Sequence, residues 1–333
     1  MVKPGDFLLT NSMSFGRPYI MGTNGCIHDG WLVLSSKHED VDQDYFFQLL
    51  SSDFIYAKFS KLAAGATVKN LNIDLVSGVE VTFPPLEEQR RIAAILDQAE
   101  TLRTQRRTAL ALLDSLTQSL FLDMFGAGES NGWPITSIEE IVDEENGGIR
   151  TGPFGSQLLH SEFVDEGVAV LGIDNAVNNE FRWSERRYIT HAKYEELKRY
   201  TVRPGDVLIT IMGTCGRCAV VPDDIPLAIN TKHLCCISVD RRRVVPGYLH
   251  AYFLRHPTAR KYLEQKAKGA IMSGLNMGII KAMPIALPPL PLQQTFATRI
   301  ASIEALKATH RHALAALDAL FASLQQQAFA GQL

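Results

Sequence analysis

The chain has 333 residues, of which 46% are hydrophobic, and its 33 lysines and arginines nearly balance its 36 aspartates and glutamates. This composition excludes a disordered chain, and apolar runs such as Val168–Ile173 are far shorter than the roughly 18 residues of a membrane helix. Five cysteines, an odd number, argue against a disulfide framework, so we expect a globular cytoplasmic protein of about two domains with no membrane segment.

An internal repeat begins within the first ten residues. The segment 3–10 (KPGDFLLT) returns 200 residues later as 203–210 (RPGDVLIT), and 83–86 (FPPL) returns 204 residues later as 287–290 (LPPL). A period near 200 is too long for a solenoid, so each copy is expected to be a domain followed by the same appendage. No residues before Lys3 correspond to residues 127–202, which predicts that the first copy lacks its N-terminal part.

The repeat divides the chain into four predicted segments. We expect an incomplete first domain over residues 1–85, a long helix over 86–126, a second domain over 127–289 and a second long helix over 290–330. Helices of 35 to 40 residues measure about 50 to 60 Å.

Both predicted helices carry apolar residues alternately three and four positions apart, a pattern typical of a coiled coil. The two seams are polar at equivalent positions, Arg106 and His310, where a polar residue sets the register. We expect the helices to pack antiparallel on each other; the alternative is that each packs on its own domain. The first seam is Ile92, Ile95, Ala99, Leu102, Arg106, Ala109, Leu113, Leu116 and Leu120, and the second is Phe296, Arg299, Ile303, Leu306, His310, Ala313, Leu317, Leu320 and Leu324.

The globular parts mix short β-rich runs with turns and helical patches, which predicts an α+β fold. The predicted strands include Val79–Phe83, Val207–Ile211, Cys218–Val221 and Leu234–Val239, and Pro246–Arg255 is predicted to be helical.

Charge is unevenly distributed along the second domain. Residues 128–175 hold one basic residue against 10 acidic ones, whereas residues 176–270 hold 17 against 9. The near-neutral total therefore conceals a basic segment suited to phosphates, which includes the run Arg241-Arg242-Arg243. Solvated surface is the alternative for each of these charges.

Several segments together resemble the specificity subunit of type I restriction–modification systems. They are Gly152-Pro153-Phe154-Gly155-Ser156-Gln157, Pro204-Gly205-Asp206, Gly213-Thr214-Cys215-Gly216, Ser273-Gly274-Leu275-Asn276 and the two Pro-Pro-Leu segments that precede the long helices, with Asn70-Leu71-Asn72 in the first copy. Their order, their duplication and the helix after each copy carry the likeness.

The resemblance implies a non-catalytic, DNA-binding subunit. Its fold would be α+β, with two target-recognition domains, the first truncated at its N-terminal side, separated by two long conserved helices that form an antiparallel coiled coil. Each domain would read half of a bipartite site in double-stranded DNA, at a spacing set by the helices. The helices would dock methyltransferase subunits, and restriction subunits can join the assembly. The alternative is a decoy that binds the methyltransferase subunit without reading DNA.

Candidate DNA contacts lie in and around the segments that carry the likeness: polar side chains that can bond base edges and phosphates, and Phe154, whose ring can stack or pack. For the Gly-Pro-Phe-Gly segment, a plain structural loop is the alternative. The candidates are Arg150, Thr151, Phe154, Ser156, Gln157, Arg217, Lys232, His233, Lys268, Ser273 and Asn276, with Lys69, Asn70 and Asn72 in the first copy.

No constellation for catalysis stands out. Neither Pro-Pro-Leu segment has the polar first residue or the aromatic of a DNA amino-methyltransferase motif, and no phosphate-binding loop is present. Cys215, Cys218, His233, Cys235 and Cys236 have spacings at which thiolates can bind zinc. Because adjacent strand residues point to opposite faces, we expect buried thiols rather than a metal site, and no cofactor. A zinc-dependent enzyme is the remaining alternative.

Overall fold

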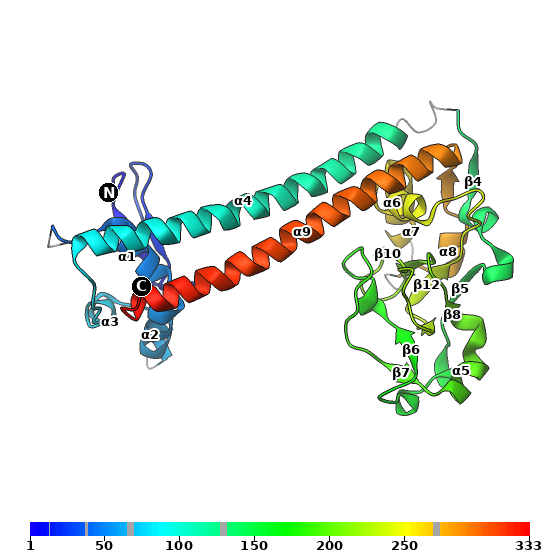
Figure 1. Cartoon of the computed structure of the whole chain (residues 1–333), viewed down its shortest axis with the longest axis horizontal. Helices are drawn as coiled ribbons and strands as arrows, with labels where there is room; N and C mark the ends of the chain where they lie inside the picture. The colour runs from blue at the N-terminus through cyan, green and yellow to red at the C-terminus, as the bar shows by residue number, and fades with distance from the viewer. Residues whose placement is uncertain (13, 37–38, 65–69, 127–131, 269–273) are drawn as a thin grey trace. The chain divides into compact units, whose positions relative to one another are not determined.

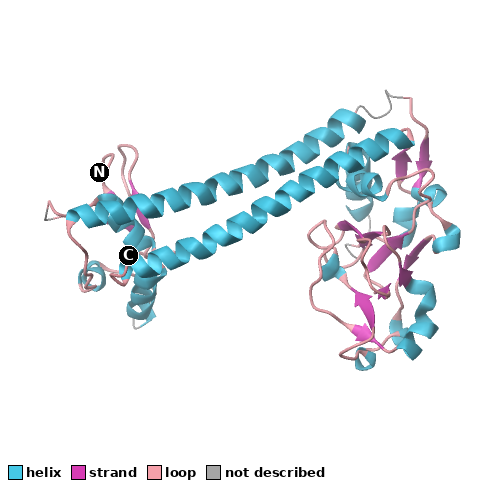
Figure 2. Cartoon of the chain, viewed as in Figure 1, coloured by secondary structure: helices cyan, strands magenta, loops and turns pink. Residues whose placement is uncertain are grey.

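A computed structural model describes the chain except residues 13, 37–38, 65–69, 127–131 and 269–273. The chain divides into two compact units. Unit 1 comprises Met1–Leu112 and Lys307–Leu333, and unit 2 comprises Leu113–Leu306. Both contain helices and sheets (Figure 2), which confirms the predicted α+β class. No helix among the described residues has the length and apolarity needed to cross a membrane.

Unit 1 holds a three-stranded antiparallel sheet of order β2-β1-β3, with helices packed on one face. Its core gathers apolar side chains that are almost completely buried, among them Leu9, Tyr45, Phe59 and Leu96. The elements are β1 Phe7–Thr10, β2 Pro18–Ile20, β3 Trp31–Leu34, α1 Gln43–Ser51, α2 Asp53–Ala64, α3 Ile73–Ser77, and parts of α4 Leu86–Phe125 and α9 Leu290–Phe329.

Within unit 1, the segments of α4 and α9 lie side by side and run antiparallel (Figure 1). Arg103 Nε donates to Asp318 Oδ1 at 2.6 Å, and the Arg103 guanidinium lies 4.4 Å from the ring centre of Phe321. Three residues further along α4, Arg106 meets His310 of α9. Residues of increasing number on α4 therefore contact residues of decreasing number on α9, which is the predicted antiparallel packing.

Unit 2 holds two four-stranded sheets, of order β10-β9-β12-β5 and β7-β6-β11-β8, and a two-stranded sheet of β13 and β4. The strands are β4 Ile135–Ser137, β5 Ile149–Thr151, β6 Val168–Leu171, β7 Tyr188–Ile189, β8 Thr201–Val202, β9 Val207–Thr210, β10 Cys218–Val220, β11 Ala228–Asn230, β12 Leu234–Ile237 and β13 Pro284–Ala286.

Helices cover one face of the first sheet of unit 2, and the second sheet packs on its other face. The helices are α5 His191–Leu197, α6 Pro246–Arg255, α7 Pro257–Lys268 and α8 Met277–Lys281, with parts of α4 and α9 and short 3-10 turns. Here α4 and α9 meet through aromatic rings: Phe296 lies 5.6 Å from Phe121 and 5.2 Å from Phe125, between ring centres. This packing places the helix pair in the core of unit 2.

Each unit joins the start of its long helix to its domain through a buried glutamine. In unit 1, Gln89 Oε1 accepts from Asp42 N, and its Nε2 donates to Pro84 O at 2.8 Å. In unit 2, Gln293 Oε1 accepts from Val245 N, and its Nε2 donates to Pro288 O at 2.8 Å. The repeat in the sequence is therefore a repeat of specific contacts.

The predicted heptad seam is shifted by one residue at every second position. Leu102, Leu116, Leu306 and Leu320 are 39–50% exposed and do not lie in a closed seam. The inward positions one residue later are Leu96, Arg103, Leu110 and Thr117 on α4 and Ile300, Lys307, Leu314 and Phe321 on α9. A seam that steps three and then four residues from Ile92 and a seam that steps four and then three have every second position in common. Where they differ, neighbouring residues such as Ile95 and Leu96 are both apolar, so the sequence fits either seam.

The predicted strand Val79–Phe83 is wrong, since these residues are not in a strand. Their counterparts around β13 do form a strand, because β13 pairs with β4, with Ile285 opposite Thr136. Among the described residues, unit 1 contains no strand equivalent to β4. A strand needs a partner for its backbone groups, so the same sequence pattern gives different structures in the two units.

Candidate nucleic-acid interface

Four segments of unit 2 meet at one end of the β10-β9-β12-β5 sheet, and we call them the loop edge: residues 152–157, 211–217, 231–233 and 274–276. They follow β5, follow β9, precede β12 and precede α8. Ile211 N donates to His233 O at 2.9 Å, and Leu275 N donates to Ile211 O at 3.1 Å. The strand register thus gathers segments that lie far apart in the sequence.

The segment 152–157 packs closely on the end of β11. A Cβ atom on Gly152 would lie 2.0 Å from Asn230 O, so only glycine permits this approach. Gly155 has φ +56°, in the left-handed region that favours glycine. The resulting turn leaves Phe154 51% exposed, and Ser156 and Gln157 are also exposed.

A cavity of about 380 Å³ lies behind this turn and is lined by Pro153, Gly155, Leu158, Phe163, Gly172, Ile173, Asp174, Arg187, Thr231, Lys232 and His233. Arg187 forms an ion pair with Asp174. Three buried polar atoms of this lining have no hydrogen-bond partner among the described residues: Asp174 Oδ2, Arg187 Nε and Thr231 Oγ1. A buried donor or acceptor without a hydrogen bond raises the free energy of the folded protein. Because the cavity holds both kinds, it suits a ligand that both donates and accepts hydrogen bonds.

Two cations of the loop edge are available for a polyanion. Among the described residues, neither Lys232, which lines the cavity, nor the exposed Arg217 forms an ion pair. The segment that carries Arg217 approaches the cavity wall, since a Cβ atom on Gly213 would lie 3.3 Å from Ile173 Cδ1. Burial, reinforced by Lys232 and Arg187, lowers the pKa of His233, which favours the neutral imidazole. His233 therefore provides hydrogen bonding rather than charge at neutral pH.

Arg150 was predicted to contact DNA, and the structure shows that this is wrong. The side chain is buried, and its Nη2 lies 2.7 Å from Asp206 Oδ2. Its Nη1 donates to Ser238 Oγ at 3.0 Å. The guanidinium therefore binds partners inside unit 2 instead of facing a ligand. Its neighbour Thr151 pairs with Cys235 in the sheet and is half-buried.

Two predicted asparagines cap helices instead of presenting their side-chain oxygens outward. Asn276 Oδ1 accepts from Ile279 N at 2.9 Å, and Asn72 Oδ1 accepts from Leu75 N at 2.8 Å. These are equivalent positions of the repeat and equivalent caps, at α8 and α3. Asn70 is exposed in a loop. Lys69 and Ser273 lie outside the described residues, as does the side chain of Lys268.

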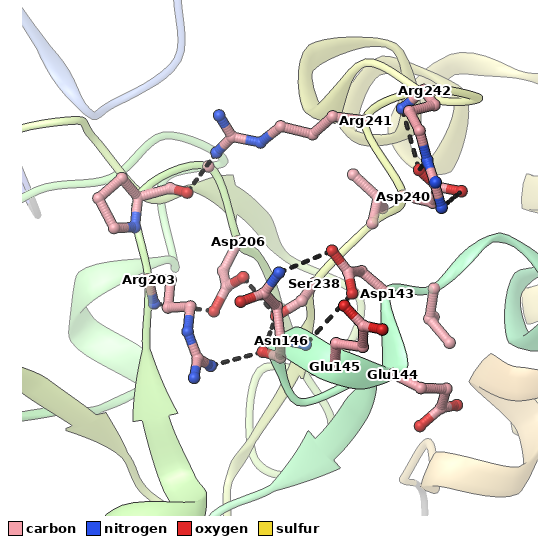
Figure 3. Close-up of a pocket in the computed structure, with 14 residues that line it drawn as sticks. Asp143, Glu144, Glu145, Asn146, Arg203, Asp206, Ser238, Asp240, Arg241 and Arg242 are labelled. Atoms are coloured by element: carbon pink, nitrogen blue, oxygen red, sulfur yellow. Dashed lines mark hydrogen bonds and ion pairs between the residues drawn. The ribbon is translucent and has the colours of Figure 1, made fainter.

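Several other cations of the basic segment form ion pairs or donate to backbone oxygens within unit 2. Arg241 donates to Pro204 O, and Figure 3 shows Arg242 bound to Asp240. Both arginines line a cavity of about 840 Å³ whose wall also carries Asp143, Glu144 and Glu145. Further pairs join Lys193 to Glu162 and Lys198 to Glu195. The net charge of this segment therefore overstates its free positive surface. The sequence alone could not show these pairings because they join residues of different elements.

Three cysteines of unit 2 are buried in its interior, and Cys215 is partly buried. Cys218 and Cys235 belong to one apolar cluster, and Cys236 belongs to another on the opposite face of the sheet. Burial raises the pKa of Cys235 to about 12 and raises that of Cys236 well above its ordinary range. Such thiols stay protonated and are inert, whereas zinc binding needs thiolates. Among the described residues, no group of three or more histidine, cysteine or acidic side chains is arranged to hold a metal ion.

Comparison with known proteins relates the whole chain to one kind of subunit. It is 24% identical over 303 residues to the type I restriction enzyme EcoBI specificity subunit of Escherichia coli, covering 81% of this chain and 62% of that one. It is 26% identical over 375 residues to the EcoKI specificity subunit of Escherichia coli K12, covering 100% and 75%. The chain thus spans between about three-fifths and three-quarters of these relatives' lengths.

Solved structures show the same fold. The S subunit of the type I restriction–modification system from M. genitalium matches with a TM-score of 0.63 at 14% identity, covering 99% of this chain and 84% of that one. A chain from a structure of complex assembly in the type I R-M system matches with a TM-score of 0.60 at 20% identity, covering 100% and 83%. The family model of the type I restriction modification DNA specificity domain matches residues 2–111 and 161–318. The chain therefore belongs to the type I restriction–modification specificity subunit family.

Proposed function

We propose that this chain directs a methyltransferase to a bipartite site in double-stranded DNA and has no catalytic activity of its own. The observation that carries the proposal is the loop edge of unit 2, where Lys232 lines a cavity that the segment of Arg217 approaches. Among the described residues, neither cation forms an ion pair, and the cavity holds donors and acceptors without hydrogen-bond partners. The cations suit phosphates, and the mixed polar atoms suit base edges.

A second half-site could be recognised by unit 1. Its sheet has an end equivalent to the end at which the loop edge of unit 2 lies. Leu71 N donates to Asn11 O at 2.7 Å, and the equivalent bond of unit 2 runs from Leu275 N to Ile211 O. Both units therefore place a loop against the end of their first repeated strand. Two related surfaces on one chain suit two half-sites.

Exposed leucines on the long helices support docking of the methyltransferase subunit. Unit 1 exposes Leu102 and Leu320, and unit 2 exposes Leu306 and Leu116, each between 39 and 50%. Leu102 is equivalent to Leu306 in the repeat, and Leu116 is equivalent to Leu320. Each unit thus presents one copy of the same leucine pair, and a repeated apolar surface suits a partner that binds twice.

The experiment uses the purified full chain and a pool of randomised duplexes. Selection should enrich a sequence with two fixed parts, and incubation of the chain alone with a methyl donor should not methylate DNA. Enrichment of no sequence would refute DNA recognition, and methylation by the pure chain would refute the non-catalytic role.

A further inference from the structure

The repeated sheets of the two units differ at one edge. The strands β1, β2 and β3 of unit 1 correspond to β9, β10 and β12 of unit 2, with the same antiparallel pairing. In unit 2, β5 adds to the free side of β12 and places Arg150 opposite Cys236. Among the described residues, no strand adds to the corresponding side of β3.

The strand β5 is held in unit 2 through its arginine. Arg150 Nη2 lies 2.7 Å from Asp206 Oδ2, and Nη1 donates to Ser238 Oγ at 3.0 Å. Ser238 Oγ in turn donates to Asp206 Oδ1 at 2.6 Å, an arrangement drawn in Figure 3 for these last two residues. A carboxylate and a hydroxyl thus form a receptor for the guanidinium.

Unit 1 retains both parts of this receptor. Asp6 occupies the position of Asp206 in the Pro-Gly-Asp turn: Lys3 N donates to Asp6 Oδ2 at 2.8 Å, as Arg203 N does to Asp206 Oδ2 at 2.9 Å. Ser35 directly follows β3, as Ser238 follows β12. Asp6 and Ser35 line one groove of about 680 Å³. Among the described residues, no basic side chain forms an ion pair with Asp6.

The sheet around this receptor is open in unit 1 and closed in unit 2. Val33 of β3 is 47% exposed, whereas its counterpart Cys236 is completely buried. Tyr19 of β2 is 51% exposed, whereas its counterpart Ala219 is completely buried. Exposed strand edges with apolar side chains are templates for the addition of another strand.

We propose that unit 1 binds an arginine-bearing β-strand of another polypeptide chain, which adds to β3 with its arginine opposite Val33 and its guanidinium on Asp6 and Ser35. The backbone of β3 would supply hydrogen bonds, and the exposed side chains of β2 and β3 would supply apolar contacts. Arginine is specified because its planar fork can engage a carboxylate and a hydroxyl together, as in unit 2, whereas a lysine ammonium is a point charge. This inference goes beyond the proposed function and uses neither DNA nor the methyltransferase.

The test combines the full chain with a synthetic peptide of the sequence 145–153, which contains the β5 strand and its arginine. The edge of β12 is already occupied by β5 of the chain, so the peptide has unit 1 as its target. Hydrogen exchange of the backbone of Trp31–Leu34, followed against peptide concentration, measures strand addition. We expect exchange to slow at millimolar peptide, without a change at Leu234–Ile237.

Two matched controls isolate the arginine. A peptide with methionine in place of its arginine, and the chain variant Asp6→Asn, should each weaken binding about tenfold or more, because each removes a charged partner. The asparagine oxygen can still accept from Lys3 N, so the turn is kept. Equal binding by the methionine peptide, unchanged binding by Asp6→Asn, or no slowing of exchange with the arginine peptide would each overturn the proposal.

Discussion

Arg106 Nη1 lies 3.2 Å from His310 Nδ1, and the two residues are equivalent positions of the internal repeat, 204 residues apart. Arg103 of the same helix contacts Asp318, so the two helices run antiparallel, and equivalent residues of such a pair meet at one level only. The contact also places a polar layer in a largely apolar seam, which favours this register over others. The helix pair is therefore specified by one pair of residues as well as by its apolar surface.

Replacing both partners by leucine should raise the stability of the helix pair. Arg106→Leu with His310→Leu replaces two half-buried polar side chains by apolar ones, and partial burial of the two leucines should stabilise the protein by about 1 kcal/mol or more. Chemical denaturation of the full chain measures the change. A single Arg106→Leu variant is the control, and it should gain less. A double variant less stable than the wild-type chain would mean that the contact itself stabilises the pair.

The two long helices and their antiparallel pairing could be predicted from the repeat and from the spacing of apolar residues. The sequence could not predict which residues of each helix face the other helix. A seam through Leu102 and a seam through Arg103 both pass through Ile92, Ala99 and Arg106. The choice is made by contacts across the helix pair, where Arg103 reaches Asp318 and Phe321. Such contacts are absent from a single-sequence pattern.

Breaking the buried ion pair of unit 2 should destabilise the protein. Arg150→Met leaves the buried Asp206 carboxylate without its cation, which costs about 3 to 5 kcal/mol. Thermal unfolding should show a large decrease in the melting temperature. The exposed Arg217→Met is the matched control and should unfold like the wild-type chain. Wild-type stability of Arg150→Met would restore Arg150 as a candidate for DNA contact.

The available cations of the loop edge should control the salt dependence of DNA binding. Lys232→Met and Arg217→Met should each weaken binding, and each should reduce the slope of log affinity against log salt by about one. Arg242→Met is the control, because Arg242 is paired with Asp240, and it should leave the slope unchanged. A larger effect for Arg242→Met than for Lys232→Met would place the DNA surface at the cavity of Figure 3 instead.

Methyltransferase docking should depend on the exposed leucine pairs. Leu102→Glu with Leu320→Glu should reduce the amount of methyltransferase subunit that copurifies with the chain, with no loss of folded protein. Leu112→Glu is the control, because Leu112 is 65% exposed and its counterpart in the repeat is Ala316. Undiminished copurification with the double variant would move the docking surface elsewhere.

The stability of unit 2 should fall as the pH drops below about 6.5. Burial lowers the pKa of His250, whose Nε2 lies 2.9 Å from Asn179 O and 3.0 Å from Cys218 O, and burial also lowers the pKa of His256. The unfolded chain then binds protons at a higher pH than the folded chain, so acid favours unfolding. His250→Gln keeps a donor for these carbonyls and should flatten the decline in melting temperature. An equally steep decline in this variant would assign the effect to other groups.

Part of the candidate site could be predicted from the sequence. The Gly-Pro-Phe-Gly turn and Lys232-His233 do share one cavity, because β5 and β12 are neighbours in the sheet. Arg187 of the same cavity belongs to the basic segment, but nothing in the sequence places it beside this turn, and its partner Asp174 stands in no distinctive sequence pattern. Arg150 was misjudged because its partner Asp206 is 56 residues away in the chain.

Whether this chain directs methylation to a bipartite DNA site can be measured in a map of methylated bases in the host genome. The map is compared between a strain with the intact gene, a strain without it, and a strain with Lys232→Met and Phe154→Ala together. We expect one bipartite motif that is methylated only when the gene is present and whose recognition is relaxed in one half by the double substitution. An identical methylated motif in all three strains would show that the chain does not direct methylation.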